Sequence, residues 1–537
     1  MSSQNFGMKS YMKGALLLTV AAIIVKVLSA AYRVPFQNLV GDQGFYVYQQ
    51  VYPFIAFFVV WTSTGFAVAI SKMLADFESS GVQSEAEKRA VSTIIFRYLT
   101  ALSLIFFCVL FFGADLLAGF MWDAQLAPLL RTGAFVTLCM PMLALLKGTY
   151  QAKAMMEPVA YAQVFEQMIR VSIILVGTVI VMATSQSVYA AGTMAMLGTV
   201  LGEVAGVILL VFYMRKKLGS KNLPKIHVPA WPIIKEVTFF SVSISMSGLL
   251  LLCFQLVDSF SVFSMLIQSG MAEVEAMELK GIYDRGQPLV QLGIVIASSL
   301  SLAIVPLVAF KSKNNNGRGA IPFIQLTYRT AILFAVAAAL GLILVMPYVN
   351  VMLFKTDALS GVLMLYVVQI IPLSIILTFT AILQGYSKLK VPAGILLIGI
   401  LLKILGNLLL IQLFEMFGAA LASNIGLIVA AVALIWYLKR LMSVQLASRR
   451  FYVQLVIASV AMIFTVKLVA VLLTNILGDV ENSRISAVWY SGILIFAGAF
   501  VFITIVAKLR LLAVKEWFLI PLGRRMATYQ LWLNRKK

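Results

Sequence analysis

Long runs of apolar residues, separated by short polar stretches, follow one another along the whole chain of 537 residues. A helix needs about 20 apolar residues to cross a bilayer, and by that rule the pattern predicts about fourteen membrane-spanning helices. The predicted spans lie near residues 12–36, 46–71, 90–113, 126–150, 157–182, 187–213, 236–260, 286–310, 322–350, 361–386, 391–413, 417–438, 451–476 and 486–507. The longest loops between them run to roughly 20–25 residues, which is too short for a further domain. We therefore expect an all-α integral membrane protein.

The composition supports this fold class. The chain is 61% hydrophobic and only 12% charged, with a mean hydropathy of +0.98. A soluble domain needs many more charges on its surface, so the soluble class is excluded. The first apolar stretch, "GALLLTVAAIIVKVLSAAYRVPF", carries Lys26 and lacks a small-residue cleavage site. We interpret it as the first span and not as a cleaved signal peptide.

The formal net charge of +21 would suit a nucleic-acid partner, but the positions of the basic residues argue against one. With the N-terminus inside, about thirty of the lysines and arginines fall in inside segments, an asymmetry typical of cytoplasmic loops. The outside loops hold only Lys280, Arg285, Lys355 and Arg484. The pattern predicts that both termini are cytoplasmic.

Two basic segments are expected to meet anionic membrane lipids. One is "RKKLGSKNLPK" from Arg215, and the other is the tail "GRRMATYQLWLNRKK" from Gly523. Such clusters beside a span are attracted to anionic headgroups. The tail, with Trp517 and Trp532, is predicted to lie flat on the inner surface, although a pure topology signal would give the same pattern.

The sequence offers no sign of a metal, a cofactor or an ATP-driven pump. Cys108, Cys139 and Cys253 all lie in apolar segments and are expected to be small core residues. His227 is the only histidine. Neither a zinc motif nor a phosphate-binding loop is present in the sequence.

An internal repeat divides the chain. The segments "GFYVYQQVYPFIAFFVVWTSTGFAVAI" and "GIYDRGQPLVQLGIVIASSLSLAIV" begin at Gly44 and Gly281, which are 237 residues apart. "ALLKGTYQAKAMMEP" and "AILQGYSKLKVP" place Gly148 and Gly385 at the same offset. One offset shared by two motifs suggests duplication. Since it covers six predicted spans, the two lobes should be related by a pseudo-two-fold axis along the membrane normal, with a cavity between them.

The repeat gives the predicted domain organisation. The N-lobe occupies residues 1–214, a basic cytoplasmic linker 215–235, and the C-lobe 236–440. An extra pair of spans follows in 441–508, and a basic amphipathic tail in 509–537.

Charged residues inside spans are costly, so each needs a partner or a watery cavity. Basic residues in this position include Lys26, Arg33, Arg97, Arg131, Arg170, Arg329, Lys403 and Lys467. Arg97, Arg131 and Arg329 lie near span ends, where they can reach the interface. Arg170 follows Glu166 by four residues on one helix face, which predicts a structural ion pair.

The remaining cations suggest an anion site. Lys26 and Arg33 are seven residues apart and share one face of the first span. Arg285 stands beside Asp284 at the mouth of the eighth span, and Lys403 shares a face with Asn407. Acidic residues in spans are fewer and include Glu166 and Asp258. A cavity lined by Lys26, Arg33 and Arg285 would favour a phosphate or pyrophosphate. Local packing and interfacial anchoring are the alternatives for these residues.

Four stretches, taken in order, carry a resemblance to a known family. They are "IIVKVLSAAYRVPFQNLVGDQGFYVYQ", "GFAVAISKML", "YQAKAMMEPVAYAQVFEQMIRV" and "YDRGQPLVQLGIVIASSLSLAIVPLVA". The chain resembles the multidrug/oligosaccharidyl-lipid/polysaccharide exporter superfamily over essentially its whole length. More narrowly, it resembles the polysaccharide and lipid II flippase branch, with its MurJ-type and stage V sporulation protein B-like members.

The resemblance implies a flippase in the bacterial cell membrane. Such a protein would move an undecaprenyl-pyrophosphate-linked sugar across the bilayer by alternating access, with a coupling ion or the membrane potential as driving force. It further implies substrate contacts at Lys26, Arg33 and Arg285, with Asp284, Gln50 and Lys403 as further candidates. Arg33 lies one position from the family's second basic residue. The second span carries only Gln49 and Gln50 where the lipid II branch often adds charges. We expect a monomer.

Two other function classes remain open at this stage. A cation-coupled multidrug exporter of the same fold would need carboxylates in the cavity, which the basic face of the first span does not favour. A membrane glycosyltransferase would need an acidic catalytic cluster in a large outer loop. The loop "SGMAEVEAMELKGIYDRG" is acidic but short, so we expect a transporter and not an enzyme.

Overall fold

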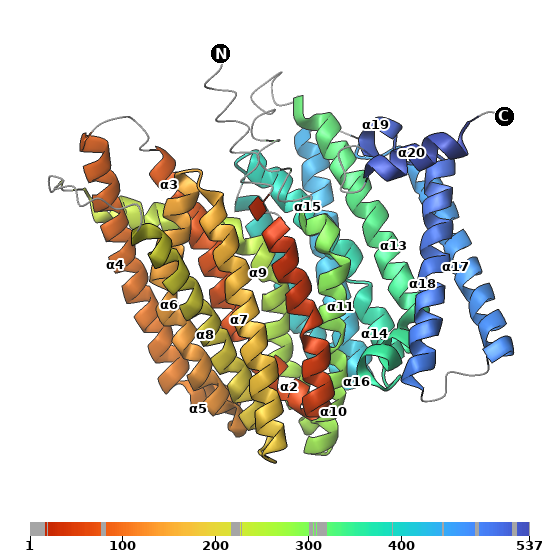
Figure 1. The fold of residues 1–537 in the computed structure, drawn as a ribbon, viewed down its shortest axis with the longest axis horizontal. Helices are drawn as coiled ribbons and strands as arrows, with labels where there is room; N and C mark the ends of the chain where they lie inside the picture. Colours follow the sequence, from red (N-terminus) through yellow and green to blue (C-terminus); the bar gives the residue numbers. More distant parts are fainter. Residues whose placement is uncertain are drawn as a thin grey trace. The chain divides into compact units, whose positions relative to one another are not determined.

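The computed structural model describes residues 17–18, 20–76, 82–215, 226, 228–299, 304, 308, 319–388, 390–442, 445–477, 483–517 and 523–535. Within these residues the secondary structure is entirely helical, without strands (Figure 1). Eleven of the described helices are long and apolar enough to cross a membrane. The all-α membrane fold predicted from the hydropathy pattern is confirmed.

The chain divides into two compact units, which are described separately. The first unit contains Met1–Asp284 together with Lys403–Glu415. Its helices are α2 (Arg33–Val60), α3 (Ala67–Asp76), α4 (Val82–Phe112), α5 (Ala114–Phe120), α6 (Ala127–Ala152), α7 (Met156–Ala183), α8 (Val188–Arg215), α9 (Ala230–Gln268) and α10 (Glu273–Asp284), with the π-helix η1 (Trp61–Phe66) and the 3-10 turn η2 (Ala124–Leu126). Residues 20–31 form a helix that precedes α2. Helix α9 packs against α2, η1, α3 and α4, and α10 packs against α2 (Figure 1).

The second unit contains Arg285–Leu402 and Met416–Lys537. It comprises α11 (Gly286–Gly293), α13 (Ile321–Phe354), α14 (Ser360–Val367), α15 (Ile370–Gly385), most of α16 (Lys390–Met442), α17 (Arg449–Leu477), α18 (Arg484–Lys508), α19 (Val514–Trp517) and α20 (Gly523–Leu533). Helix α18 packs between α13 and α17, and α20 packs against α18 (Figure 1).

Two of the apolar helical segments are too long to be single spans. Val20–Ala75 has 56 residues and would be roughly 84 Å long if straight, against roughly 30 Å of hydrocarbon. Gly41 interrupts it with φ 69° and ψ −172°, a conformation that glycine adopts without strain. The hydroxyls of Tyr32 and Tyr48 then meet at 2.5 Å, so the two halves lie antiparallel.

Helix α16 contains a similar break. Glu415 has φ 48° and ψ −124° inside its 53 residues. Gly399 and Gly426 lie on either side of this break, and a Cβ on Gly399 would be only 3.0 Å from the Gly426 carbonyl oxygen. Such small residues allow two helices to approach closely within a membrane. The break and this contact indicate a helical hairpin.

The helices correspond closely to the predicted spans. Each of the two hairpins contains two predicted spans, and the tenth is divided between α14 and α15. The first span is described only from Leu17, without Thr19, and most of the eighth beyond Ser299 lies outside the described residues, as does His227. The number of fourteen, the lobe boundaries and the axis relating the lobes stay predictions.

Candidate functional site

The first helical hairpin carries a cation that forms no salt bridge with a described residue. Arg33 follows Lys26 by two helical turns, and its side chain is turned toward the second helix of the hairpin, where it is fully buried. None of its three guanidinium nitrogens makes a hydrogen bond to a described residue. Lys26, in contrast, lies on an exposed part of residues 20–31.

Aromatic side chains surround Arg33. Its guanidinium carbon lies 4.5 Å from the centre of the Tyr52 ring. Tyr48 packs 5.5 Å from Tyr52, and its hydroxyl is bonded to that of Tyr32. We call Tyr32, Tyr48 and Tyr52 the tyrosine cage. A desolvated guanidinium is stabilised by such rings, by about 2 kcal/mol or more.

The cage does not neutralise the charge that it holds. A buried cation normally pairs with a carboxylate, because desolvating an unpaired charge costs several kcal/mol. No salt bridge of the first unit among the described residues includes Arg33, so no described carboxylate lies within ion-pair distance of it. An anion that enters from outside the protein would complete this site.

Gln50 lies two residues before Tyr52 on the same helix and is also fully buried. Its Nε2 donates to the carbonyl of Ser259 on α9 at 2.9 Å, while its Oε1 accepts no hydrogen bond from a described residue. Gln50 therefore joins α2 to α9 and has capacity for one further donor.

A second group of buried charges lies on α9, α10 and α16 within the first unit, and here each charge is paired. Asp258 is its centre. Its carboxylate forms an ion pair with Lys403 at 2.5 Å and accepts hydrogen bonds from Asn407 at 2.9 Å and Tyr283 at 3.2 Å. Lys403 is completely buried. These contacts indicate that Lys403 has a structural role, in which it holds the Lys403–Glu415 segment to α9. They do not indicate a substrate-binding cation.

Asp284 also has a partner. Its two oxygens accept hydrogen bonds from Lys280 at 2.7 and 2.6 Å, one helical turn earlier in α10. Both side chains are buried. Asp284, a candidate substrate contact, therefore forms an ion pair with Lys280.

Glu166 and Arg170, which the sequence predicted as an ion pair, each form a salt bridge with a residue of another helix. Glu166 pairs instead with Lys147 of α6 at 2.9 Å, and Arg170 pairs with Glu203 of α8 at 2.5 Å. The two residues do share one face of α7, as their spacing requires. Because α7 contacts both α6 and α8, however, each side chain reaches a partner on a neighbouring helix.

The structure thus adds residues that sequence reasoning missed. Lys147 and Glu203 lie inside predicted spans and should have been counted among the intramembrane charges. Lys280 was placed in an outer loop, but it is buried on α10. The tyrosine cage could not be predicted from the sequence, which shows only three tyrosines near the hairpin. Its side chains come together because the chain reverses direction at Gly41.

Arg285 belongs to the second unit, where it is fully buried. Its guanidinium donates to Oδ1 of Asn350 at 2.9 Å and lies 5.0 Å from the Phe354 ring. Asn350 in turn donates to the carbonyl of Ala358. Arg285 therefore fastens the start of α11 to the end of α13. Its convergence with Lys26 and Arg33 on one cavity stays a prediction.

Nothing in the described ranges brings three or more His, Cys, Asp or Glu side chains together as metal ligands. The exposed pair of Arg131 and Asp115 joins α6 to α5 at one end of the first unit. The candidate site is therefore a cationic one, made by Lys26, Arg33 and the tyrosine cage.

Comparison with known proteins places the chain in a family. A family model described as "Polysaccharide biosynthesis protein" matches residues 11–310. The uncharacterized membrane protein YabM of Bacillus subtilis (strain 168) is 36% identical over 414 residues, 76% of each chain. The lipid II flippase MurJ of the same organism is 24% identical over 439 residues, 78% of this chain and 80% of that one. The stage V sporulation protein B of Bacillus subtilis (strain 168) is 31% identical over 218 residues, 40% of each chain.

Solved structures show the same fold. A lipid II flippase MurJ in an inward closed conformation superposes with a TM-score of 0.68 at 14% identity, covering 92% of this chain and 99% of that one. An inward-facing MATE multidrug resistance transporter superposes with a TM-score of 0.59 at 13% identity, covering 80% and 98%. The chain therefore belongs to the polysaccharide biosynthesis protein family, in the flippase branch of the multidrug/oligosaccharidyl-lipid/polysaccharide exporter superfamily.

Proposed function

We propose that this multi-pass membrane transporter moves an undecaprenyl-pyrophosphate-linked sugar from the inner to the outer leaflet by alternating access. The cargo would be lipid II or a related precursor of a cell-wall or surface polysaccharide. Both termini would be cytoplasmic, and the protein would work as a monomer in the bacterial cell membrane, driven by a coupling ion or by the membrane potential.

The observation that carries this proposal is Arg33. A cation that is fully buried and has no carboxylate partner among the described residues needs an anion to balance it. A pyrophosphate supplies that charge together with acceptor oxygens for the fork of the guanidinium. Lys26, two turns away and exposed, is a suitable first contact for the same anion.

The paired carboxylates weigh against a drug exporter that binds organic cations. Asp258, Asp284, Glu166 and Glu203 each have a basic partner, so these buried acids are not waiting for a cationic cargo. The related MurJ and stage V sporulation protein B support the flippase assignment, but they do not specify the cargo of this chain.

Depletion of the protein tests the proposal. The native strain should accumulate one undecaprenyl-linked precursor on the inner leaflet, and mass spectrometry of extracted lipids would identify it. Expression of wild-type protein should clear the precursor, whereas Arg33→Gln at equal membrane levels should not. Arg97→Gln, which removes an exposed arginine from α4, is the matched control and should clear it. Unchanged precursor levels after depletion would refute the proposal.

A further inference from the structure

The chain after the last span is folded back onto the second unit. Nε1 of Trp517 donates to Oε1 of Gln530 at 2.5 Å, and Nε2 of Gln530 donates to the carbonyl of Leu512 at 3.1 Å. Asn534 donates to the carbonyl of Ala507 at 3.1 Å. Helices α19 and α20 are thereby fixed at the end of α18 (Figure 1). The tail is therefore a folded element that is held by specific hydrogen bonds.

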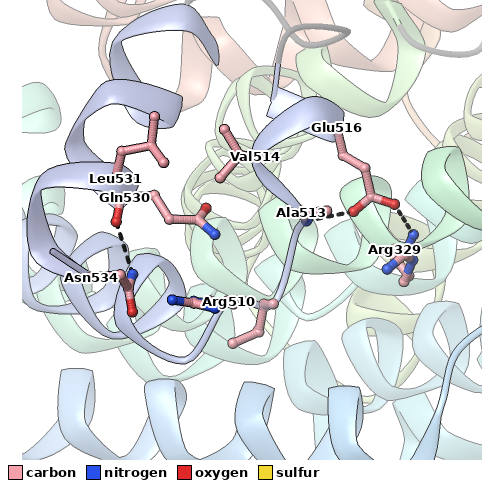
Figure 2. Close-up of a pocket in the computed structure, with 9 residues that line it drawn as sticks. Arg329, Arg510, Ala513, Val514, Glu516, Gln530, Leu531 and Asn534 are labelled. Atoms are coloured by element: carbon pink, nitrogen blue, oxygen red, sulfur yellow. Dashed lines mark hydrogen bonds and ion pairs between the residues drawn. The ribbon is translucent and has the colours of Figure 1, made fainter. Parts of the chain in front are cut away.

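A pocket of about 440 Å³ opens within this folded tail. The residues that line it are Arg329, Arg510, Leu511, Ala513, Val514, Glu516, Gln530, Leu531 and Asn534. Figure 2 shows Arg510, Gln530 and Asn534 grouped on one side and the pair of Glu516 with Arg329 on the other. Glu516 also accepts a hydrogen bond from the amide of Ala513 at 2.7 Å, so its charge is already balanced.

Arg510 is the cation that remains available in this pocket. It is exposed and lies in the turn between α18 and α19, with φ 56°. Its guanidinium is bonded to no residue in the described part of the chain. The amides of Gln530 and Asn534 stand beside it as further polar groups (Figure 2). The pocket therefore offers one unbalanced positive charge, beside amides that are themselves held by the folded tail.

The pocket also lies at the end of an apolar helix that is long enough to cross a membrane. The apolar span of α18 ends at Lys508, two residues before Arg510. Leu531 and Trp532 on α20 are 56% and 65% exposed, and Trp532 stacks on Tyr529. Exposed tryptophan and leucine beside basic residues are typical of a helix in the membrane interface. Arg524 and Arg525 are exposed on the same helix.

We propose that this pocket binds the headgroup phosphate of an anionic phospholipid, with Arg510 contacting the phosphate and Leu531 and Trp532 contacting the acyl region. The positive charge selects an anionic group, and the exposed apolar side chains beside it select a lipid over a free ion. This site is separate from the proposed cargo site and does not depend on it.

Lipid retention on the purified full-length protein tests this proposal. The protein would be titrated with phosphatidylglycerol or phosphatidylcholine of equal chain length, and bound lipid counted by native mass spectrometry. Phosphatidylglycerol should bind preferentially. Arg510→Gln should weaken its binding about tenfold or more, because a direct hydrogen bond between charged groups is lost. Arg510→Lys should retain most of the binding.

Arg524→Gln is the matched control, since it removes the same charge from α20 without lining the pocket. It should bind phosphatidylglycerol like the wild type. An equal loss of phosphatidylglycerol binding in both variants would indicate diffuse attraction of the lipid to a basic tail. That result would refute the proposal that the pocket is a lipid site. Displacement of the lipid by inorganic phosphate at similar concentration would overturn the choice of a lipid. An unchanged unfolding temperature of Arg510→Gln confirms that the tail remains folded.

Discussion

Arg33 and Lys403 are both fully buried cations on membrane helices of the first unit, yet they have opposite surroundings. Lys403 meets the carboxylate of Asp258 at 2.5 Å, and Asn407 and Tyr283 complete the coordination of that carboxylate. Arg33 meets the ring of Tyr52 and has no carboxylate partner among the described residues. Burial alone therefore does not distinguish a structural cation from a candidate binding cation, whereas the partner does.

The difference follows from the cost of an unbalanced charge. A buried ion pair repays much of its desolvation through its partner, and it is disrupted severely when one member is removed. A buried cation without a partner retains its desolvation penalty until an anion binds to it. We infer that the Asp258 group holds helices together, while Arg33 and its tyrosine cage are set up for cargo.

The largest effect is expected from breaking the Asp258 pair. Lys403→Ala leaves a buried carboxylate alone and should destabilise the protein by about 3–5 kcal/mol. The measurement is unfolding of purified protein, together with its level in the membrane. The double variant Asp258→Asn, Lys403→Met removes both charges and should recover most of the loss. A stable Lys403→Ala protein would show that the pair is not a tether.

Arg33→Gln should show the opposite behaviour. It removes an unpaired cation, so the protein should accumulate at wild-type levels and unfold at a similar temperature. Loss of a charge-assisted contact of about 1.5–3 kcal/mol should weaken cargo binding about ten- to a hundredfold. Complementation of a flippase-depleted strain would reveal the defect. Wild-type growth with Arg33→Gln would place the cargo contact elsewhere.

The pairs around α7 should give an intermediate effect. Glu203→Gln keeps a hydrogen-bonding side chain but leaves Arg170 without its carboxylate, which should cost about 1–3 kcal/mol of unfolding free energy. Glu166→Gln should act similarly through Lys147. A double-mutant cycle with Arg170→Met would isolate the interaction. A coupling energy near zero for Glu203 with Arg170 would contradict the observed pairing.

The smallest effect is expected at the surface. Asp115 and Arg131 form an ion pair whose side chains are 69% and 41% exposed. Exposed pairs contribute about 0–1 kcal/mol, so Asp115→Asn should change the unfolding temperature very little. This variant calibrates the others. A loss of stability as large as that of Glu203→Gln would contradict the expectation that exposed ion pairs contribute less than buried ones.

Hydropathy predicted the spans well because each apolar run must become one helix in lipid. The spacing of Lys26 and Arg33 predicted a shared helix face, whereas the structure has Lys26 exposed in the helix of residues 20–31 and Arg33 fully buried at the start of α2. The same reasoning missed the salt-bridge partners of Glu166 and Arg170, because helical spacing reports neighbours within α7 and cannot report Lys147 on α6 or Glu203 on α8. The tyrosine cage was not predicted for the same reason, since Tyr32 contacts Tyr48 only because the chain forms a hairpin at Gly41.

The tail shows a further limit of sequence reasoning. Composition predicted a basic amphipathic segment, and α20 does carry exposed Trp532 beside basic residues. Arg329 was expected to reach the interface alone, but it pairs with Glu516 across 187 residues of sequence. No local pattern encodes a contact at that separation, so the pocket beside Arg510 became visible only in the folded structure.

The most direct test of the central claim is binding of undecaprenyl pyrophosphate to purified full-length protein, measured by native mass spectrometry or fluorescence titration. Wild-type protein should bind it about ten- to a hundredfold more tightly than Arg33→Gln, while both bind undecaprenol equally and weakly. Arg97→Gln should match the wild type. Equal affinity of wild type and Arg33→Gln for undecaprenyl pyrophosphate would contradict the assignment of the unpaired Arg33 as the phosphate-binding cation.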